Sequence, residues 1–156
     1  SPGKNEIIVS DLALPSDYSG RKAANRVVYV SYSSNTTADD VYRIEDKEVY
    51  RLDVKHGKKV AMASIAYRGT CNGGKLLAGG VLADDANSAK ALVRICSNPE
   101  KYFSKWEEPT KPPTGGAVSG RANAQLVWSR DGNEAYCATS TNHVEGCYCL
   151  GQYDLT

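Results

Sequence analysis

The chain has 156 residues, a length that suits one domain with a buried hydrophobic core. Nineteen basic against eighteen acidic residues give a net charge of +1, so bulk electrostatic attraction to nucleic acid or to a membrane is not expected. No apolar run approaches the roughly 18 residues of a membrane-spanning helix. Ten tyrosines against one phenylalanine are typical of a sheet-rich protein.

Three features of the sequence favour secretion. The first residue is Ser1 rather than methionine, as expected where a signal peptide has been removed. Asn35 begins a glycosylation sequon, and five cysteines in a small chain favour an oxidising compartment over the cytosol. We therefore expect a secreted, extracellular protein that is glycosylated at Asn35, makes no membrane contact, and is compatible with delivery into host cells.

The N-terminal part of the chain is predicted to be an arm followed by strands. Residues 1–22 contain two prolines and a short apolar patch, which indicates an N-terminal arm or an edge strand. Within residues 23–67, β-branched and aromatic side chains concentrate over 26–32, as in a β-strand. Residues 41–44 are extended next, and residues 48–54 alternate between apolar and charged side chains. That alternation predicts a strand with one solvated face.

A hairpin is predicted between Tyr50 and Tyr67. Residues 55–58 contain a glycine between basic side chains and are expected to form its turn. Residues 59–67 then return as a strand with small side chains.

Residues 69–75 nearly spell a phosphate-binding loop, with glycines preceding Lys75. Such a loop needs a serine or threonine directly after the lysine to hold magnesium, and this position is Leu76. No helix is predicted to start there either. We therefore interpret this stretch as a glycine-rich turn and expect no nucleotide and no other cofactor.

One α-helix is predicted over about residues 85–97. Asp84 or Asp85 can cap its first turn, and Pro99 ends it. Its buried stripe would consist of residues at the i, i+3, i+4, i+7 spacing, namely Ala89, Leu92, Val93 and Cys96. This stripe is expected to pack the helix onto the sheet.

The last third of the chain, residues 114–150, is predicted to form a β-meander. Aliphatic and aromatic side chains over 125–128 indicate a strand, and Asp131-Gly132 is a strong turn signal because glycine accepts positive φ. The chain is expected to return over 135–137 and to add a third strand over 146–149.

The five cysteines are predicted to form two disulfide bridges and to leave one thiol over. We expect Cys71 to pair with Cys147 or Cys149, whichever of these two is not the spare thiol, and Cys96 to pair with Cys137. A zinc site made by Cys137, His143, Cys147 and Cys149 is the alternative. Structural zinc normally takes two close ligand pairs, which this spacing lacks, so no metal is expected.

A basic and aromatic face is predicted on the strands between residues 41 and 60. Cationic and aromatic side chains together suit the stacking of RNA bases. The candidate binding residues are Tyr42, Arg43, Tyr50, Arg51, Lys55, Lys58 and Lys59. The alternative is that these side chains form the solvated side of an antiparallel sheet.

Several short motifs between Tyr67 and Cys149 occur in the order of one known family. They are the tyrosine and cysteine of 67–71, the helical pattern of 84–96, the proline and tyrosine of 98–102, the glycines of 115–120, the strand of 126–128, the turn of 131–132 and the closing cysteines. On these motifs, residues 67–149 resemble the secreted fungal guanyl-specific ribonucleases and the ribonuclease-like effectors of plant-pathogenic fungi. The resemblance implies one helix packed on an antiparallel sheet.

Where the sequence departs from this family, the departures imply that its catalysis has been lost. The family needs two histidines, a glutamate and an arginine for proton transfer and for stabilising phosphate charge. Glu100, Gln125 and Asn142 occupy the positions of the first histidine, the arginine and the second histidine. His143 is one residue away, which on a strand turns a side chain to the opposite face. A ribonuclease-like scaffold of this kind is expected to bind rather than to cleave.

The sequence thus predicts a single α+β domain over residues 1–156. It would contain an antiparallel sheet of about six strands, one packed helix, and disulfides to the C-terminal strands. Residues 23–67 would supply N-terminal strands, and residues 67–150 the ribonuclease-like helix and the β-meander.

The expected function is that of a secreted fungal effector or virulence factor, not an enzyme. Its expected partner is a host protein, an immune receptor among them, or RNA. An active secreted endoribonuclease with a rearranged site is the first alternative, and its candidate residues are His143, Glu107, Glu108 and Arg121. An extracellular carbohydrate-binding module is the second.

Overall fold

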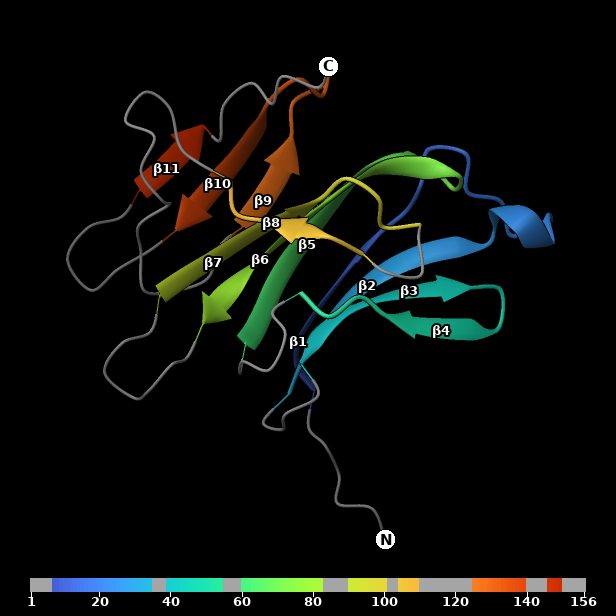
Figure 1. Ribbon diagram of the computed structural model, residues 1–156, viewed down its shortest axis with the longest axis horizontal. Coiled ribbons are helices and arrows are strands. Elements are labelled where there is room, and N and C mark those ends of the chain that lie inside the picture. Colours follow the sequence, from blue (N-terminus) through green and yellow to red (C-terminus); the bar gives the residue numbers. More distant parts are fainter. Residues whose placement is uncertain are drawn as a thin grey trace, which may run out of the picture.

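The fold is described from a computed structural model of the chain. The structure describes residues 7–34, 39–54, 60–82, 90–100, 104–109, 125–139 and 146–149. Within these ranges the chain forms eleven β-strands, one short 3-10 turn (η1, Ala23–Asn25) and no α-helix. Figure 1 shows that the strands are grouped into three antiparallel sheets.

The N-terminal sheet contains four strands in chain order: β1 (Ile7–Ala13), β2 (Val27–Ser34), β3 (Asp40–Glu45) and β4 (Glu48–Arg51). A two-residue turn joins β3 to β4, because Glu45 is paired with Glu48. Its first central residue, Asp46, has φ of 51°, which aspartate tolerates better than most residues. The Arg26 guanidinium forms an ion pair of 2.6 Å with this aspartate.

The middle sheet also follows chain order: β5 (Val60–Thr70), β6 (Gly73–Leu82), β7 (Lys90–Cys96) and β8 (Trp106–Glu107). The C-terminal sheet has β10 (Ala135–Thr139) at its centre, between β9 (Gln125–Trp128) and β11 (Gly146–Cys149). The predicted β-meander is confirmed by this pairing.

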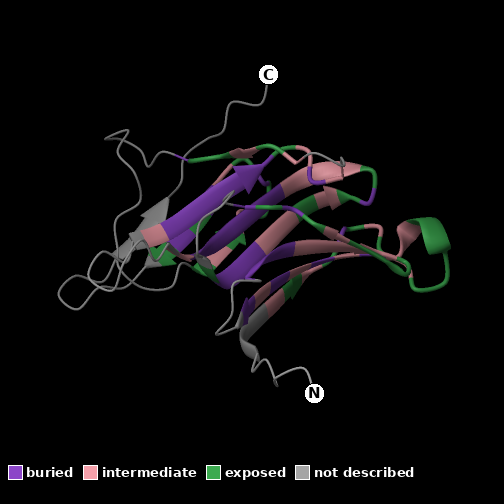
Figure 2. Cartoon of the chain, turned by 60° about the horizontal axis from the view of Figure 1, so that its bottom comes forward, coloured by how far each residue is buried: buried purple, intermediate pink, exposed green. Residues whose placement is uncertain are grey.

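Two hydrophobic cores lie on opposite faces of the middle sheet. The first core joins it to the N-terminal sheet and includes Tyr29, Leu76 and Leu92. The second joins it to the C-terminal sheet and includes Leu77 and Cys137. Consecutive residues of β6 therefore point into different cores, as the pleat of a strand requires. Figure 2 shows the buried residues along the central strands and the exposed ones at turns.

The predicted α+β class is wrong, because the described part of the predicted helix is a strand. Residues 90–96 form β7, which pairs with β6 and places Cys96 opposite Leu76. Residues 85–89, the N-terminal part of the expected helix, lie outside the described residues. Because β7 is covered on both faces, its residues 91–96 are apolar in both directions, apart from Arg94, and lack the alternation that marks a half-buried strand.

The predicted hairpin between Tyr50 and Tyr67 is also wrong. Tyr50 belongs to β4, which pairs with β3, whereas Tyr67 belongs to β5, which pairs with β6. The two strands therefore lie in different sheets. Residues 55–58, the expected turn, lie outside the described residues, as does residue 59.

The predicted disulfides are wrong as well. Cys71 and Cys96 carry buried free thiols, and burial raises the pKa of both. Both thiols face the first core, whereas Cys137 faces the second, so the middle sheet separates the expected partners. Cys147 and Cys149 lie on β11 in the C-terminal sheet, on the far side of the middle sheet from Cys71.

Asp17 ties the segment after β1 to the turn between β5 and β6. Its carboxylate accepts the Cys71 N–H at 2.7 Å and the Asn25 side-chain amide at 3.1 Å. Hydrogen bonds from Cys71 hold the pKa of Asp17 below its ordinary value. The charged carboxylate therefore stabilises the fold at pH values above the unfolded pKa of about 3.9, and this contribution is lost as pH falls through the lower, folded pKa.

We therefore expect the Asp17→Asn variant to lose less stability on acidification than the original chain. Urea unfolding of both proteins in steps from pH 6 to pH 2 measures this difference. The two curves should converge only where the pH lies below the lowered, folded pKa of Asp17, because its carboxyl group is then uncharged in the folded as well as in the unfolded protein. Parallel curves across the whole range would show that the charge of Asp17 contributes nothing.

Candidate functional site

The four described members of the predicted basic and aromatic face lie on β3 and β4. Tyr42 is paired with Arg51, and Arg43 is paired with Tyr50. Cross-strand partners share a face, whereas neighbours along a strand point to opposite faces. The structure therefore divides the set between two faces of the N-terminal sheet. Lys55, Lys58 and Lys59 lie outside the described residues.

Arg43 and Tyr50 occupy the inner face, toward the first core. The Arg43 guanidinium lies 5.9 Å from the centre of the Tyr50 ring and forms an ion pair of 2.7 Å with Glu45. Tyr29, the partner of Arg43 on β2, stacks on Tyr67 with ring centroids 4.4 Å apart. Burial raises the pKa of Tyr29 far above its ordinary value, so this phenol stays neutral.

Four buried polar atoms on this side have no hydrogen-bond partner: Tyr29 Oη, Ser31 Oγ, Arg43 Nε and Glu100 Oε2. Each of these atoms is closed to solvent, and Tyr29 has no exposed surface. A partner macromolecule cannot reach them without opening the sheets. We therefore assign Arg43 and Tyr50 to the internal structure of the protein.

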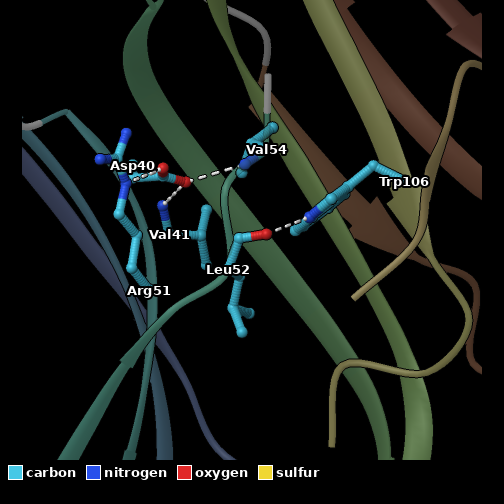
Figure 3. A network of polar contacts seen from close by, with 6 residues as sticks. All are labelled: Asp40, Val41, Arg51, Leu52, Val54 and Trp106. Atoms are coloured by element: carbon cyan, nitrogen blue, oxygen red, sulfur yellow. Dashed lines mark hydrogen bonds and ion pairs between the residues drawn. The ribbon is translucent and has the colours of Figure 1, made fainter. Parts of the chain in front are cut away.

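Arg51 lies on the outer face and is held there by Asp40 (Figure 3). The two form an ion pair of 2.6 Å, in which the aspartate side chain is 2% exposed and the arginine side chain 52%. The other Asp40 oxygen accepts the N–H of Val41 at 2.7 Å and of Val54 at 3.0 Å. The hydrogen bond that the Arg51 guanidinium donates to Asp40 raises the pKa of Arg51 above its ordinary value.

The same network fixes the point where the chain leaves the N-terminal sheet. The Trp106 indole donates a hydrogen bond of 2.8 Å to the Leu52 carbonyl, as Figure 3 shows. Leu52 and Val54 are buried in the first core, whereas Arg51 and Asp53 are exposed. The alternation expected for residues 48–54 is thus confirmed, although the strand itself ends at Arg51.

The outer face of the N-terminal sheet is almost entirely apolar. One row runs across the strands from Leu12 through Val30 and Tyr42 to Arg51. A second row contains Val28, Ile44 and Val49. Leu12 and Val49 at the ends of these rows are 61% and 62% exposed. Asp40 and Arg51, bonded to each other, are the charged residues that the described strands place on this face.

Sequence reasoning missed this face, although its signal is present in β2. Residues 27–32 are apolar or aromatic at five of six positions, so both faces of the strand are apolar. A strand of this kind is normally covered on both sides. The odd-numbered residues face the first core, and among the described residues no second layer covers the even-numbered ones.

The residues proposed for a rearranged catalytic site are not brought together in the described part of the chain. Glu107 is paired with Lys105 at 3.2 Å, and Glu108 with the buried Arg94 at 3.0 Å. His143 and Arg121 lie outside the described residues, as do Asn142 and the glycosylation candidate Asn35. Gln125, at the arginine position of the resemblance, is an exposed residue of β9.

The described residues contain no group of three or more histidine, cysteine, aspartate or glutamate side chains that could hold a metal ion. Of the alternative zinc ligands, Cys137 faces the second core, and His143 and the side chains of Cys147 and Cys149 are not described. Where the chain is described, it has no helix with the length and apolar composition of a membrane span.

Comparison of the chain with known protein families, with characterised proteins and with solved structures found no match. The resemblance to guanyl-specific ribonucleases thus stays a prediction. The helix that it implied is β7 over residues 90–96. The outer face of the N-terminal sheet is therefore the candidate functional site that the geometry itself provides.

Proposed function

We propose that this chain is a non-catalytic binding protein that docks onto another protein through the outer face of its N-terminal sheet. The main observation in support is the pair of apolar rows on this face. Leu12 at the end of one row and Val49 at the end of the other are each more than half exposed. Soluble domains seldom leave a contiguous apolar sheet face to water, and such patches mark interaction sites. The buried centre of protein interfaces is likewise apolar and poor in charge.

Charge favours a protein partner over RNA. Single-stranded RNA is bound by cationic grooves, in which unpaired basic side chains neutralise phosphates. Arg43 is paired with Glu45. Arg51, which also contacts Asp40, is the one cation that the described strands place on the outer face, and one guanidinium does not neutralise a run of phosphates. Arg43 also lies on the inner face, away from the apolar rows. An apolar protein surface thus fits this face better than a polyanion does.

Site-specific photo-crosslinking tests the proposal. A photoreactive amino acid is placed at Leu12 and, in a second protein, at Val49; a third protein carries it at the exposed Val127 of β9 as a matched control. After incubation with extract of a candidate host tissue, we expect one protein to be linked from both outer-face positions and not from the control. That protein is then purified and its affinity measured directly.

Replacement of Val30 by lysine should weaken this affinity at least tenfold, because the ammonium group would be desolvated at the centre of the interface. Circular dichroism spectra confirm that the variant is folded. Unrelated proteins linked from the two positions, or full affinity of the Val30→Lys variant, would refute the docking face. Salt-dependent binding of single-stranded RNA at micromolar concentration would refute the choice of partner.

Secretion and an effector role stay proposals beside this one. The sequon at Asn35 still supports secretion. The cysteines no longer do, since Cys71 and Cys96 are reduced and separated from their expected partners. The proposed docking function needs neither a disulfide nor a ribonuclease scaffold.

A further inference from the structure

The strand β4 forms one edge of the N-terminal sheet, and β3 is its only partner in the described chain. In an antiparallel pair, residues alternate between those that exchange backbone hydrogen bonds and those that do not. Leu52 N–H donates to the Val41 carbonyl at 2.9 Å, in the register of the β3–β4 pairing. The hydrogen-bonded pairs are therefore 41 with 52, 43 with 50, and 45 with 48.

The backbone groups of Val49 and Arg51 consequently point away from β3. The opposite edge of β3 agrees with this assignment, because Asp46 N–H donates to the Arg26 carbonyl and so places the even-numbered residues of β3 toward β2. Both outward-pointing residues are exposed. After Arg51 the chain turns inward, where Asp40 and Trp106 hold residues 52–54. Residues 52–54 therefore do not cover the outward edge of β4.

We propose that the partner adds an extended segment, as an antiparallel strand, to the open edge of β4. This inference rests on the proposed docking function and names the kind of partner. Strand addition supplies affinity through backbone hydrogen bonds and specificity through alternate side chains. The residue opposite Val49 would continue the apolar outer face. The residue opposite Arg51 would be acidic, because this guanidinium is half exposed beyond its contact with Asp40.

A basic residue of the partner would lie opposite Glu48, which is exposed and on the inner side of the edge. Opposite charges across a strand pair are favourable, and like charges are unfavourable. The segment is therefore expected to carry an acidic and a basic residue three positions apart, with an apolar residue between them facing Val49.

A second copy of this chain does not meet that pattern. In an antiparallel pairing of β4 with itself, outward-pointing residues must face each other, so Arg51 would lie opposite residue 49 or 51 of the other copy. These are a valine and an arginine, and neither of them is acidic. Asp53 does not continue this edge, because the strand ends at Arg51 and Asp53 has a φ of 51°. The occupant is accordingly a different protein.

A synthetic peptide of eight residues provides the probe. It alternates valine with threonine, and carries one glutamate set to face Arg51 and one lysine set to face Glu48. The matched control is the same peptide with N-methyl groups on the amides that would face β4, which keeps every side chain but removes the backbone donors. Binding to the full chain is followed by NMR titration and by amide hydrogen exchange.

We expect the Val49 and Arg51 amides to exchange quickly in the free protein and at least roughly tenfold more slowly with the peptide, while the Tyr50 amide is protected throughout. The N-methylated peptide should leave all three unchanged. Val49→Pro removes only an outward N–H and should weaken binding at least roughly tenfold, whereas Val49→Thr, which keeps the N–H, should stay within about threefold.

Slow exchange of Val49 and Arg51 in the free protein, equal binding of the N-methylated peptide, or no response at millimolar peptide would overturn strand addition. Dimers that Val49→Pro abolishes would overturn it too, since a second copy would then occupy the edge. Val30→Lys separates the two proposals, because it lies two strands from the edge and should leave peptide binding intact. Peptide binding without specific cross-links from Leu12 and Val49 would refute the docking face alone. Specific cross-links from these two positions without peptide binding would refute strand addition alone.

Discussion

Replacing Gly80 by alanine is expected to destabilise the protein by about 3 kcal/mol, the upper part of the range for overpacked interiors. Gly80 lies on β6 opposite Met62, next to an irregularity in β5 between Met62 and Ser64. A Cβ atom at this position would lie 2.2 Å from the Ala61 carbonyl oxygen and 3.0 Å from the Met62 Cα. Both are backbone atoms, so no side-chain rotation relieves the contact. Urea unfolding measures the loss as a lower midpoint with an unchanged m value.

Gly73→Ala is the matched control, in the same strand and with the same change of one methyl group. A Cβ atom on Gly73 would meet nothing within 4 Å. Its expected effect is within about 0.5 kcal/mol, because a glycine with room for a side chain is replaced at little cost. Equal losses for the two variants would show that the close approach of β5 to Gly80 is not the cause.

The glycines of the β5–β6 hairpin show what the local sequence cannot predict. Residues 69–75 were predicted to form a glycine-rich turn, and the turn itself occupies only the link from Thr70 to Gly73. Gly74 and Gly80 lie inside β6 because atoms of β5 approach their Cα atoms closely. That requirement depends on the partner strand, which the local sequence does not identify.

The helix predicted over the residues of β7 was wrong for a related reason. Its apolar residues at 91, 92, 93, 95 and 96 satisfy a helical spacing as well as they satisfy a strand buried on both faces. The choice between the two depends on whether a third layer exists. The C-terminal sheet is that third layer, and it packs on β7 through the second core. The sequence of residues 90–96 does not indicate that this layer is present.

Local turn chemistry, by contrast, was sufficient for the β-meander. Asp131 accepts the Ser129 hydroxyl at 2.6 Å and the Asn133 N–H at 3.2 Å, and Gly132 has φ of +69°. These contacts lie within five residues, so the sequence contains all of their partners. The candidate site shows the opposite case, because Arg51 could be singled out from the sequence but its pairing with Asp40 depends on the register of β3 and β4.

Replacing Asp40 by alanine is expected to destabilise the protein by about 3 kcal/mol, because each buried backbone donor left without an acceptor costs about 1–3 kcal/mol. Asp40 is the acceptor for the N–H groups of Val41 and Val54, two residues that are 0% and 3% exposed. Arg51 contributes less to this cost, because its half-exposed guanidinium returns to water when the aspartate is removed.

Two further variants separate the contributions of the backbone donors and of the ion pair. Asp40→Asn keeps one acceptor oxygen of the same shape, so its expected loss lies between that of Asp40→Ala and the original chain. Arg51→Gln removes the charge partner and leaves both backbone donors satisfied, so a loss of about 1 kcal/mol is expected. Urea unfolding at pH 7 ranks the three variants. A loss for Arg51→Gln as large as that for Asp40→Ala would contradict this account, since the ion pair rather than the backbone donors would then fix residues 52–54 and the open edge of β4.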